Sequence, residues 1–130
     1  MRPGFPDRLK VELLPNGKTW VLLAPLRYDS AILGARLTVP LGFRTDFASV
    51  PRLPFAFWLT GDTAHAPAVV HDYLYRRHLF SRRISDTVFL EAMKAEGDPW
   101  WRRCLMYQAV RWFGGKAWDA VNAPTRYEGP

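Results

Sequence analysis

The stretch from Ala64 to Phe80, AHAPAVVHDYLYRRHLF, constrains the fold more than any other part of the chain. The proline near its start suits the first turn of a helix, where its missing N–H has no intrahelical partner to lose. Beyond it, Val70 and Leu74 lie on one helical stripe, and His71 and Tyr75 lie on the next. The stretch therefore predicts a helix with an apolar face toward a core and a polar strip at the edge of that core.

Short apolar runs ahead of this helix are typical of strands. Residues 10–14 and 19–23 are such runs, and Asn16-Gly17 between them favours a tight hairpin because both residues tolerate positive φ. Residues 35–39 predict a further strand. These signals place a small antiparallel sheet, the N-terminal hairpin plus one more strand, in the first forty-odd residues.

Two more helical patterns follow the central stretch. One begins with Ser85 as N-cap and continues to Glu96, and the other runs from Pro99 to Phe113. Because strands come first and helices second, the chain predicts an α+β fold in which the small antiparallel sheet packs on three helices.

The length of 130 residues indicates a single domain over residues 1–130. Residues 1–8 contain proline and glycine and predict an N-terminal arm, and residues 122–130 predict a polar C-terminal tail. Hydrophobic residues make up 48% of the chain, which supports a packed core. The single Cys104 excludes an internal disulfide. No apolar run reaches the roughly 18 residues of a spanning helix, and the N-terminus is unlike a signal peptide, so we expect no membrane span.

Charge and aromatic content point to a partner. The net charge is +6, which favours acidic partners, and arginine pairs recur in the helical half. Nucleic acid is one such partner, although no nucleic-acid motif accompanies the arginines. Aromatic residues together with arginine are the composition of interface centres, which predicts a protein partner or self-association. The predicted interface residues are Trp100, Trp101, Trp112, Trp118, Arg102 and Arg103.

Residues 42–54, GFRTDFASVPRLP, form the second informative stretch and have no helical or strand period. Their small polar residues bond local backbone, so they predict a loop. We expect this loop to lie against the central helix and to bring Asp46 near His71. In the structural interpretation, the polar residues tie loop and helix together because buried polar groups need partners. The predicted structural cluster comprises Thr45, Asp46, Ser49, His71, Asp72, Tyr75 and Asp86.

The same residues also allow chemistry. Carboxylate and imidazole groups suit general acid–base catalysis, and together they suit a divalent metal such as zinc, manganese or iron. The spacing of His65 and His71 is not that of a zinc helix, so a metal would need ligands from separate segments. The catalytic candidates are Asp46, His71, Asp72 and Asp86, and the metal-ligand candidates are Asp46, His65, His71 and Asp86.

Three segments recur together in one known family. They are Gly42-Phe43-x-Thr45-Asp46-x-Ala48-Ser49-Val50-Pro51, then Ala68-x-x-His71-Asp72-x-Leu74-Tyr75, then Asp86-x-x-Phe89 with Met93 after it and Arg82-Arg83 before it. In this order they resemble the domain-of-unknown-function family 1353, small proteins of phages and prophages. The resemblance implies a phage or prophage origin, and it brings no established activity.

These observations leave three functions open. The first is a phage accessory or structural protein that docks on other phage proteins, associated with the virion or its tail and made in the host cytoplasm. The second is a small metal-dependent hydrolase acting on cell wall or a phosphoester, with Asp46, His71 and Asp86 at its centre. The third is a nucleic-acid-binding accessory protein, whose binding would weaken steeply with salt.

Overall fold

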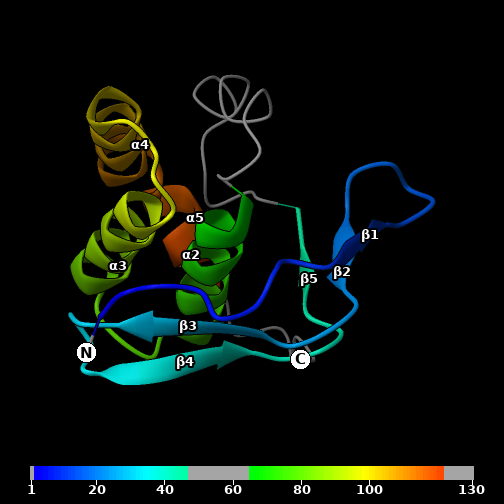
Figure 1. The fold of residues 1–130 in the computed structure, drawn as a ribbon. Helices are drawn as coiled ribbons and strands as arrows, with labels where there is room; N and C mark the ends of the chain where they lie inside the picture. Colours follow the sequence, from blue (N-terminus) through cyan, green and yellow to red (C-terminus); the bar gives the residue numbers. More distant parts are fainter. Residues whose placement is uncertain (1, 47–64, 122–130) are drawn as a thin grey trace.

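The computed structural model describes residues 2–46 and 65–121, and it confirms the α+β class (Figure 1). The strands are β1 Val11–Leu13, β2 Trp20–Leu22, β3 Leu26–Ser30, β4 Ala35–Val39 and β5 Arg44–Thr45. The helices are α2 His65–Arg77, α3 Arg82–Ala95, α4 Trp100–Phe113 and α5 Gly115–Val121. In Figure 1 the β3–β4 hairpin lies below α2 and α3.

The predicted N-terminal hairpin is confirmed. β1 and β2 pair antiparallel with Leu13 opposite Trp20, and β5 adds to the free edge of β2. The Asn16 side chain accepts hydrogen bonds from the backbone N–H groups of Lys18 and Thr19, both at 2.9 Å. Gly17 has a φ of +76°, the left-handed conformation that the turn requires.

The strand predicted at residues 35–39 is also confirmed, but it belongs to a second hairpin. β3 and β4 pair antiparallel with Leu26 opposite Val39 and form a two-stranded sheet of their own. Along β3, Leu26, Tyr28 and Ser30 are buried on one face. This period of two lays the buried face on the helices.

The described part of the predicted N-terminal arm, residues 2–8, is bound to β3. Gly4 and Asp29 exchange backbone hydrogen bonds of 3.1 and 2.8 Å. The carboxylate of Asp7 accepts hydrogen bonds from the backbone N–H and the guanidinium of Arg27, which lower the pKa of Asp7 to about 2. Composition indicated an arm because proline and glycine say nothing about such a distant partner.

Two helix starts differ from the prediction. α2 begins at His65, before the proline, and α3 begins at Arg82, with Ser81 rather than Ser85 as its N-cap. The Ser81 hydroxyl accepts a hydrogen bond from the backbone N–H of Ile84 at 3.1 Å. Ser85 is buried one turn further on, and its hydroxyl donates to the Ser81 carbonyl. Two arginines in the first turn hid this start, because cations there oppose the helix dipole.

The third predicted helix is α4, which Pro99 precedes as the flanking residue. A fourth, short helix, α5, follows Gly114 and packs against α2 and α4. The predicted C-terminal tail, residues 122–130, lies outside the described residues.

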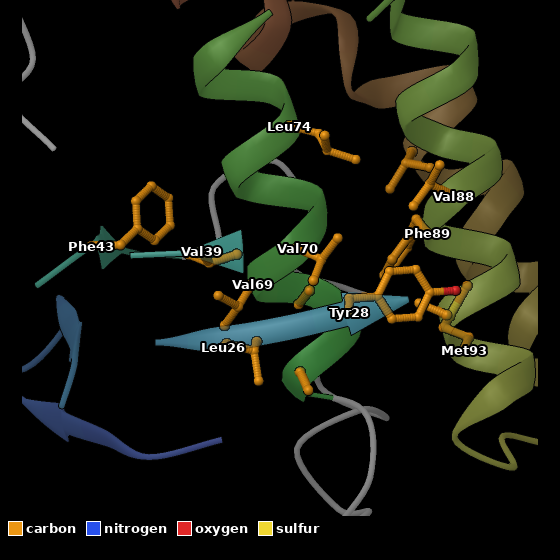
Figure 2. Packing of buried hydrophobic residues seen from close by; sticks show 14 of the residues in the cluster. Leu26, Tyr28, Val39, Phe43, Val69, Val70, Leu74, Val88, Phe89 and Met93 are labelled. Atoms are coloured by element: carbon orange, nitrogen blue, oxygen red, sulfur yellow. The ribbon is translucent and has the colours of Figure 1, made fainter. Parts of the chain in front are cut away.

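The core lies between the β3–β4 hairpin and the helices. Figure 2 shows its side chains converging from both layers. The hairpin contributes Leu26, Tyr28 and Val39; α2 contributes Val69, Val70 and Leu74; α3 contributes Val88, Phe89 and Met93; α4 adds Met106 and Val110.

Glu91 of α3 fastens the hairpin to the helices. Its carboxylate accepts hydrogen bonds from the Tyr28 hydroxyl at 2.7 Å and the Ser30 hydroxyl at 2.8 Å. It also accepts from the backbone N–H groups of Ala31 and Ile32, in the turn after β3. Burial, together with the hydrogen bond to Glu91, raises the pKa of Tyr28.

Candidate functional site

A buried imidazole–carboxylate pair joins α2 to α3. The Nε2 atom of His71 lies 2.7 Å from Oδ1 of Asp86, and both side chains are fully buried. The helical period of α3 explains the position of the carboxylate. Asp86 shares the buried stripe of Phe89 and Met93, so the same burial that packs α3 delivers Asp86 into the core beside His71.

Two further donors complete the surroundings of Asp86. The Tyr75 hydroxyl, one turn along α2 from His71, donates to Oδ1 at 2.6 Å. The Arg111 guanidinium, from α4, donates to Oδ2 at 2.7 Å. Three helices thus meet at one carboxylate, and both of its oxygens are hydrogen-bonded.

An outer layer fixes these donors. Arg82 donates from Nε to the Tyr75 hydroxyl at 3.2 Å, and from Nη2 to the backbone carbonyls of Val110 and Arg111 at 2.8 and 2.6 Å. Gly114 leaves room for the Tyr75 hydroxyl, which would lie only 2.8 Å from a Cβ at that position. Arg82 therefore holds the end of α4, and Arg111 with it, against the His71–Asp86 pair.

The electrostatics fix the charge state of Asp86. Burial works to raise the pKa of Asp86, but the hydrogen bonds from His71, Tyr75 and Arg111 and the charge of His71 outweigh it, so the pKa lies below its usual value. Burial and the hydrogen bond to Asp86 raise the pKa of Tyr75, which therefore stays protonated and donates.

This charge state determines the hydrogen-bonding role of each His71 nitrogen. Since Asp86 is an anion at neutral pH and can only accept, the short contact requires that Nε2 of His71 carry a proton. In the neutral ring, the basic lone pair then lies on Nδ1. The ring centroid of His71 lies 4.2 Å from that of Tyr75 and 4.7 Å from that of Phe89. The arrangement is that of an imidazole held in one tautomer and one orientation.

A second polar cluster lies on the adjacent strip of α2, where it meets the end of β5. Asp72 is only 3% exposed, and it accepts a hydrogen bond from the side chain of Thr45. Its Oδ2 atom lies 3.4 Å from Nε of Arg76 and has no hydrogen-bond partner. Burial raises the pKa of Asp72, although the charge of Arg76 opposes this shift. Asp46 lies 3.9 Å from the same guanidinium.

The structure distributes the predicted polar residues over these two clusters. His71, Tyr75 and Asp86 form the first, and Thr45, Asp46 and Asp72 gather at Arg76 in the second. The carboxylate hydrogen-bonded to Nε2 of His71 is that of Asp86, which was also among the predicted site residues. The side chains of Ser49 and His65 lie outside the described part of the chain.

The donor set around Asp86 does not fit the predicted metal site. Its oxygens already bind a guanidinium, a phenol and an imidazole. Among residues 2–46 and 65–121, no group of three or more histidine, cysteine, aspartate or glutamate side chains is arranged to hold a metal ion.

The predicted interface residues divide into two sets. Trp100, Trp101 and Trp112 are 68%, 48% and 73% exposed on α4. Trp118 instead stacks on His78, with ring centroids 3.6 Å apart, and packs edge-on against Tyr75. The two arginines turn toward the start of α4, where Arg102 contacts the carboxylate of Asp98 and Arg103 donates to the Asp98 carbonyl.

Sequence reasoning missed Arg82, Arg111 and Gly114. One signal was available, because an aspartate on an apolar helical stripe needs a buried cationic or hydroxyl partner. Which arginine supplies the cation depends on how α4 packs across α3, and no local pattern contains that information.

Among the helices that the structure describes, none is both long and apolar enough to cross a membrane.

Comparison with known proteins identifies the family. Residues 20–110 match the family model described as "Protein of unknown function (DUF1353)". No curated protein and no solved structure matches the chain. The matched segment contains every residue of the two polar clusters except Arg111, which lies directly after it. Since the match covers more than half of the 130 residues, the chain belongs to the DUF1353 family.

Proposed function

We propose that the protein is a hydrolase in which His71 is the general base and Asp86 positions it. The observation that carries the proposal is the 2.7 Å contact between the His71 Nε2 atom and an Asp86 carboxylate that two more side chains hold in place. A buried carboxylate that orients a histidine and stabilises its protonated form is a recurring device of hydrolases. Asp46, a candidate from the sequence, has no part in this pair.

The reaction that this geometry supports is the hydrolysis of an ester bond. Nδ1 of His71 would take a proton from water while the water oxygen attacks the carbon or phosphorus of the ester. The bond to the leaving oxygen then breaks, and the imidazolium returns the proton to that oxygen. The carboxylate of Asp86 holds the His71 ring in one orientation with its proton on Nε2, since the two groups share a buried contact. Because His71 is fully buried, substrate reaches it only when the residues that cover it move aside.

The test compares two histidines in the same helical half. His71→Gln is expected to remove hydrolysis, and His78→Gln, at a histidine stacked on Trp118 outside the cluster, is expected to keep it. The ester probes are p-nitrophenyl butyrate, bis-p-nitrophenyl phosphate and phosphatidylglycerol vesicles. Circular dichroism and chemical denaturation of both variants separate lost chemistry from lost folding.

Two outcomes would overturn the proposal. One is wild-type protein that hydrolyses none of the three ester probes. The other is a His71→Gln variant that unfolds, together with an Asp86→Asn variant that stays folded and retains full activity. The first outcome leaves the pair as a structural tie between α2 and α3.

A second candidate function rests on α4. Leu105 and Trp112 follow Trp101 by four and eleven residues, so the three lie on one side of the helix. All three are exposed. Natural monomers rarely leave such aromatic surface in water without a partner. The net charge of +6 disfavours pairing with a second copy and favours a partner with an acidic rim. This candidate is an accessory subunit that docks on an acidic protein of a phage particle, in line with the origin that the resemblance implies.

Its test is co-sedimentation of purified protein with phage particles. The double variant Trp101→Ala/Trp112→Ala is expected to lose binding, while a change at the exposed Asp119 of α5 leaves binding intact. Protein that stays monomeric and sediments with no particle protein would rule this function out.

A further inference from the structure

We propose that Asp72 is the central ligand of a calcium site formed with Thr45 and Asp46, on the strip of α2 next to His71. The cation-binding itself follows from the contacts described below, whereas its role in the reaction rests on the proposed hydrolase function.

The first argument is the state of the Asp72 carboxylate. It is almost completely buried, yet its Oδ2 atom has no hydrogen-bond partner. A buried carboxylate oxygen without a partner is costly, and in native structures it calls for a specific cause such as an ion. Asp86, which is also buried, shows the contrast, because three side chains donate to its carboxylate.

The second argument is the long distance between Asp72 and Arg76, the arginine that the described residues place beside it. The Nε atom of Arg76 lies 3.4 Å from Oδ2 of Asp72, which is longer than a charge-assisted hydrogen bond. The same guanidinium lies 3.9 Å from Asp46 and also stacks over the ring of Phe43. The Arg76 side chain is 34% exposed, so it can move into water when a calcium ion takes its place beside Asp72.

The third argument is the chemistry of the donors. Two carboxylates and a threonine hydroxyl are oxygen ligands, which suit a hard cation, and calcium accepts carboxylate, hydroxyl and water oxygens in flexible geometry. The absence of histidine and thiolate from this set disfavours zinc. Calcium completes its six to eight ligands with water, so three side chains suffice to begin a site.

The position of the proposed calcium site relative to His71 indicates how the cation would act in the proposed reaction. Asp72 directly follows His71 on the neighbouring strip of α2, and its carboxylate interacts electrostatically with His71, so the bound cation would lie within electrostatic reach of the proposed general base. There it would stabilise the negative charge that develops on the attacked ester oxygen. Asp86 on α3 would orient the base, and the cation held by the cluster at β5 would bind the electrophilic end of the substrate.

The experiment titrates the full-length protein with calcium chloride by isothermal titration calorimetry. Wild type is expected to bind one ion, and Asp72→Asn is expected to bind at least tenfold more weakly. Asp46→Asn should weaken binding less, because Asp46 is the more exposed ligand. Arg76→Gln should strengthen binding about threefold to tenfold, since it removes a competing cation held by a partly exposed ion pair. Asp119→Asn, on exposed α5, is the matched control and should bind as wild type does.

The results separate this inference from the proposed function. His71→Gln is expected to bind calcium normally while losing hydrolysis, because it removes the base and not the ligands. A wild-type protein that hydrolyses esters but shows no heat of calcium binding at millimolar concentration would overturn the site and leave the base in place. Arg76→Gln that binds no better than wild type, or Asp72→Asn that binds equally well, would overturn it too.

Discussion

Two buried carboxylates lie against the polar strips of α2, and their hydrogen-bonding environments are opposite. On the strip that faces α3, Asp86 receives hydrogen bonds from an imidazole, a phenol and a guanidinium, at distances of 2.6–2.7 Å. On the strip that meets β5, Asp72 is nearly as deeply buried but leaves one oxygen without a hydrogen bond. Burial is common to both carboxylates, so it cannot explain why their pKa values move in opposite directions.

The number of donors explains the difference. Enough hydrogen bonds to the ionised form overcome the cost of burial at Asp86, whereas at Asp72 burial outweighs the charge of Arg76 and the hydrogen bond from Thr45. A carboxylate whose two oxygens both accept hydrogen bonds is held in one geometry. A carboxylate with one oxygen that accepts no hydrogen bond can still bind a cation. We therefore assign positioning to Asp86 and ligand binding to Asp72.

The largest effect is expected from Asp86→Ala. The change removes the acceptor of the buried His71 ring and Tyr75 hydroxyl and of the partly buried Arg111 guanidinium, so the free energy of unfolding should fall by about 3–5 kcal/mol. Urea denaturation at neutral pH measures this loss. Asp119→Ala, on the surface of α5, should stay within about 0.5 kcal/mol of wild type. A loss below about 1 kcal/mol at Asp86 would mean that the three donors find other acceptors.

The contribution of Asp86 also depends on pH. Its pKa in the folded protein is lowered, so its stabilising effect is complete above the unfolded-state pKa and is lost as pH falls through the folded value.

A smaller effect is expected from Gly114→Ala, which tests how tightly the side chains around the His71–Asp86 pair are packed. A Cβ at this position would lie 2.5 Å from the Val110 carbonyl and 2.8 Å from the Tyr75 hydroxyl. The backbone is in an ordinary right-handed conformation, so the cost is steric, and we expect a loss of about 1–3 kcal/mol by thermal denaturation. Gly115→Ala is the matched control, because its Cβ would meet Arg82 only at 3.8 Å. Equal stability of the two variants would show that Tyr75 moves aside.

The smallest effect, and one of opposite sign, is expected from Asp72→Asn in calcium-free buffer. Since the folded pKa of Asp72 is raised, the carboxylate reduces stability as pH rises from the unfolded-state pKa through the folded value. The amide removes this penalty, so the variant should be between neutral and about 1 kcal/mol more stable than wild type at pH 7. Denaturation midpoints at pH 4 and pH 7 should therefore differ less in the variant. A loss of unfolding free energy comparable to that of Asp86→Ala would contradict the proposed difference between Asp72 and Asp86.

Local patterns were sufficient for much of the fold. The Asn16-Gly17 turn located the first hairpin, and the spacing of Val70 and Leu74 located the buried face of α2. The start of α3 was misplaced because Ser85 is a good N-cap residue, whereas the two arginines after the actual N-cap, Ser81, oppose the helix dipole. The attachment of the N-terminal segment to β3 could not be predicted, because its anchor, Arg27, lies twenty residues from Asp7 in the sequence.

The candidate site was less accessible from sequence. The strip of His71, Asp72 and Tyr75 follows from helical spacing, but the assignment of partners depends on packing between elements. His71 bonds to a carboxylate fifteen residues away on α3, and Arg111 reaches Asp86 from twenty-five residues away on α4. A stripe of three- and four-residue spacing shows that Asp86 is buried, and it cannot show which helix lies opposite.

Glu91 has a consequence for how the molecule reaches this state. The four hydrogen bonds that it accepts span 59–63 residues of chain and connect the strand half to the helical half. Closing so large a loop is entropically expensive, and such long-range contacts raise the contact order and slow folding. Neither half satisfies Glu91 and its four donors alone. The strands and helices should therefore unfold in one cooperative step, and the calcium ligands contributed by Thr45 and Asp72 should assemble only when both halves have docked.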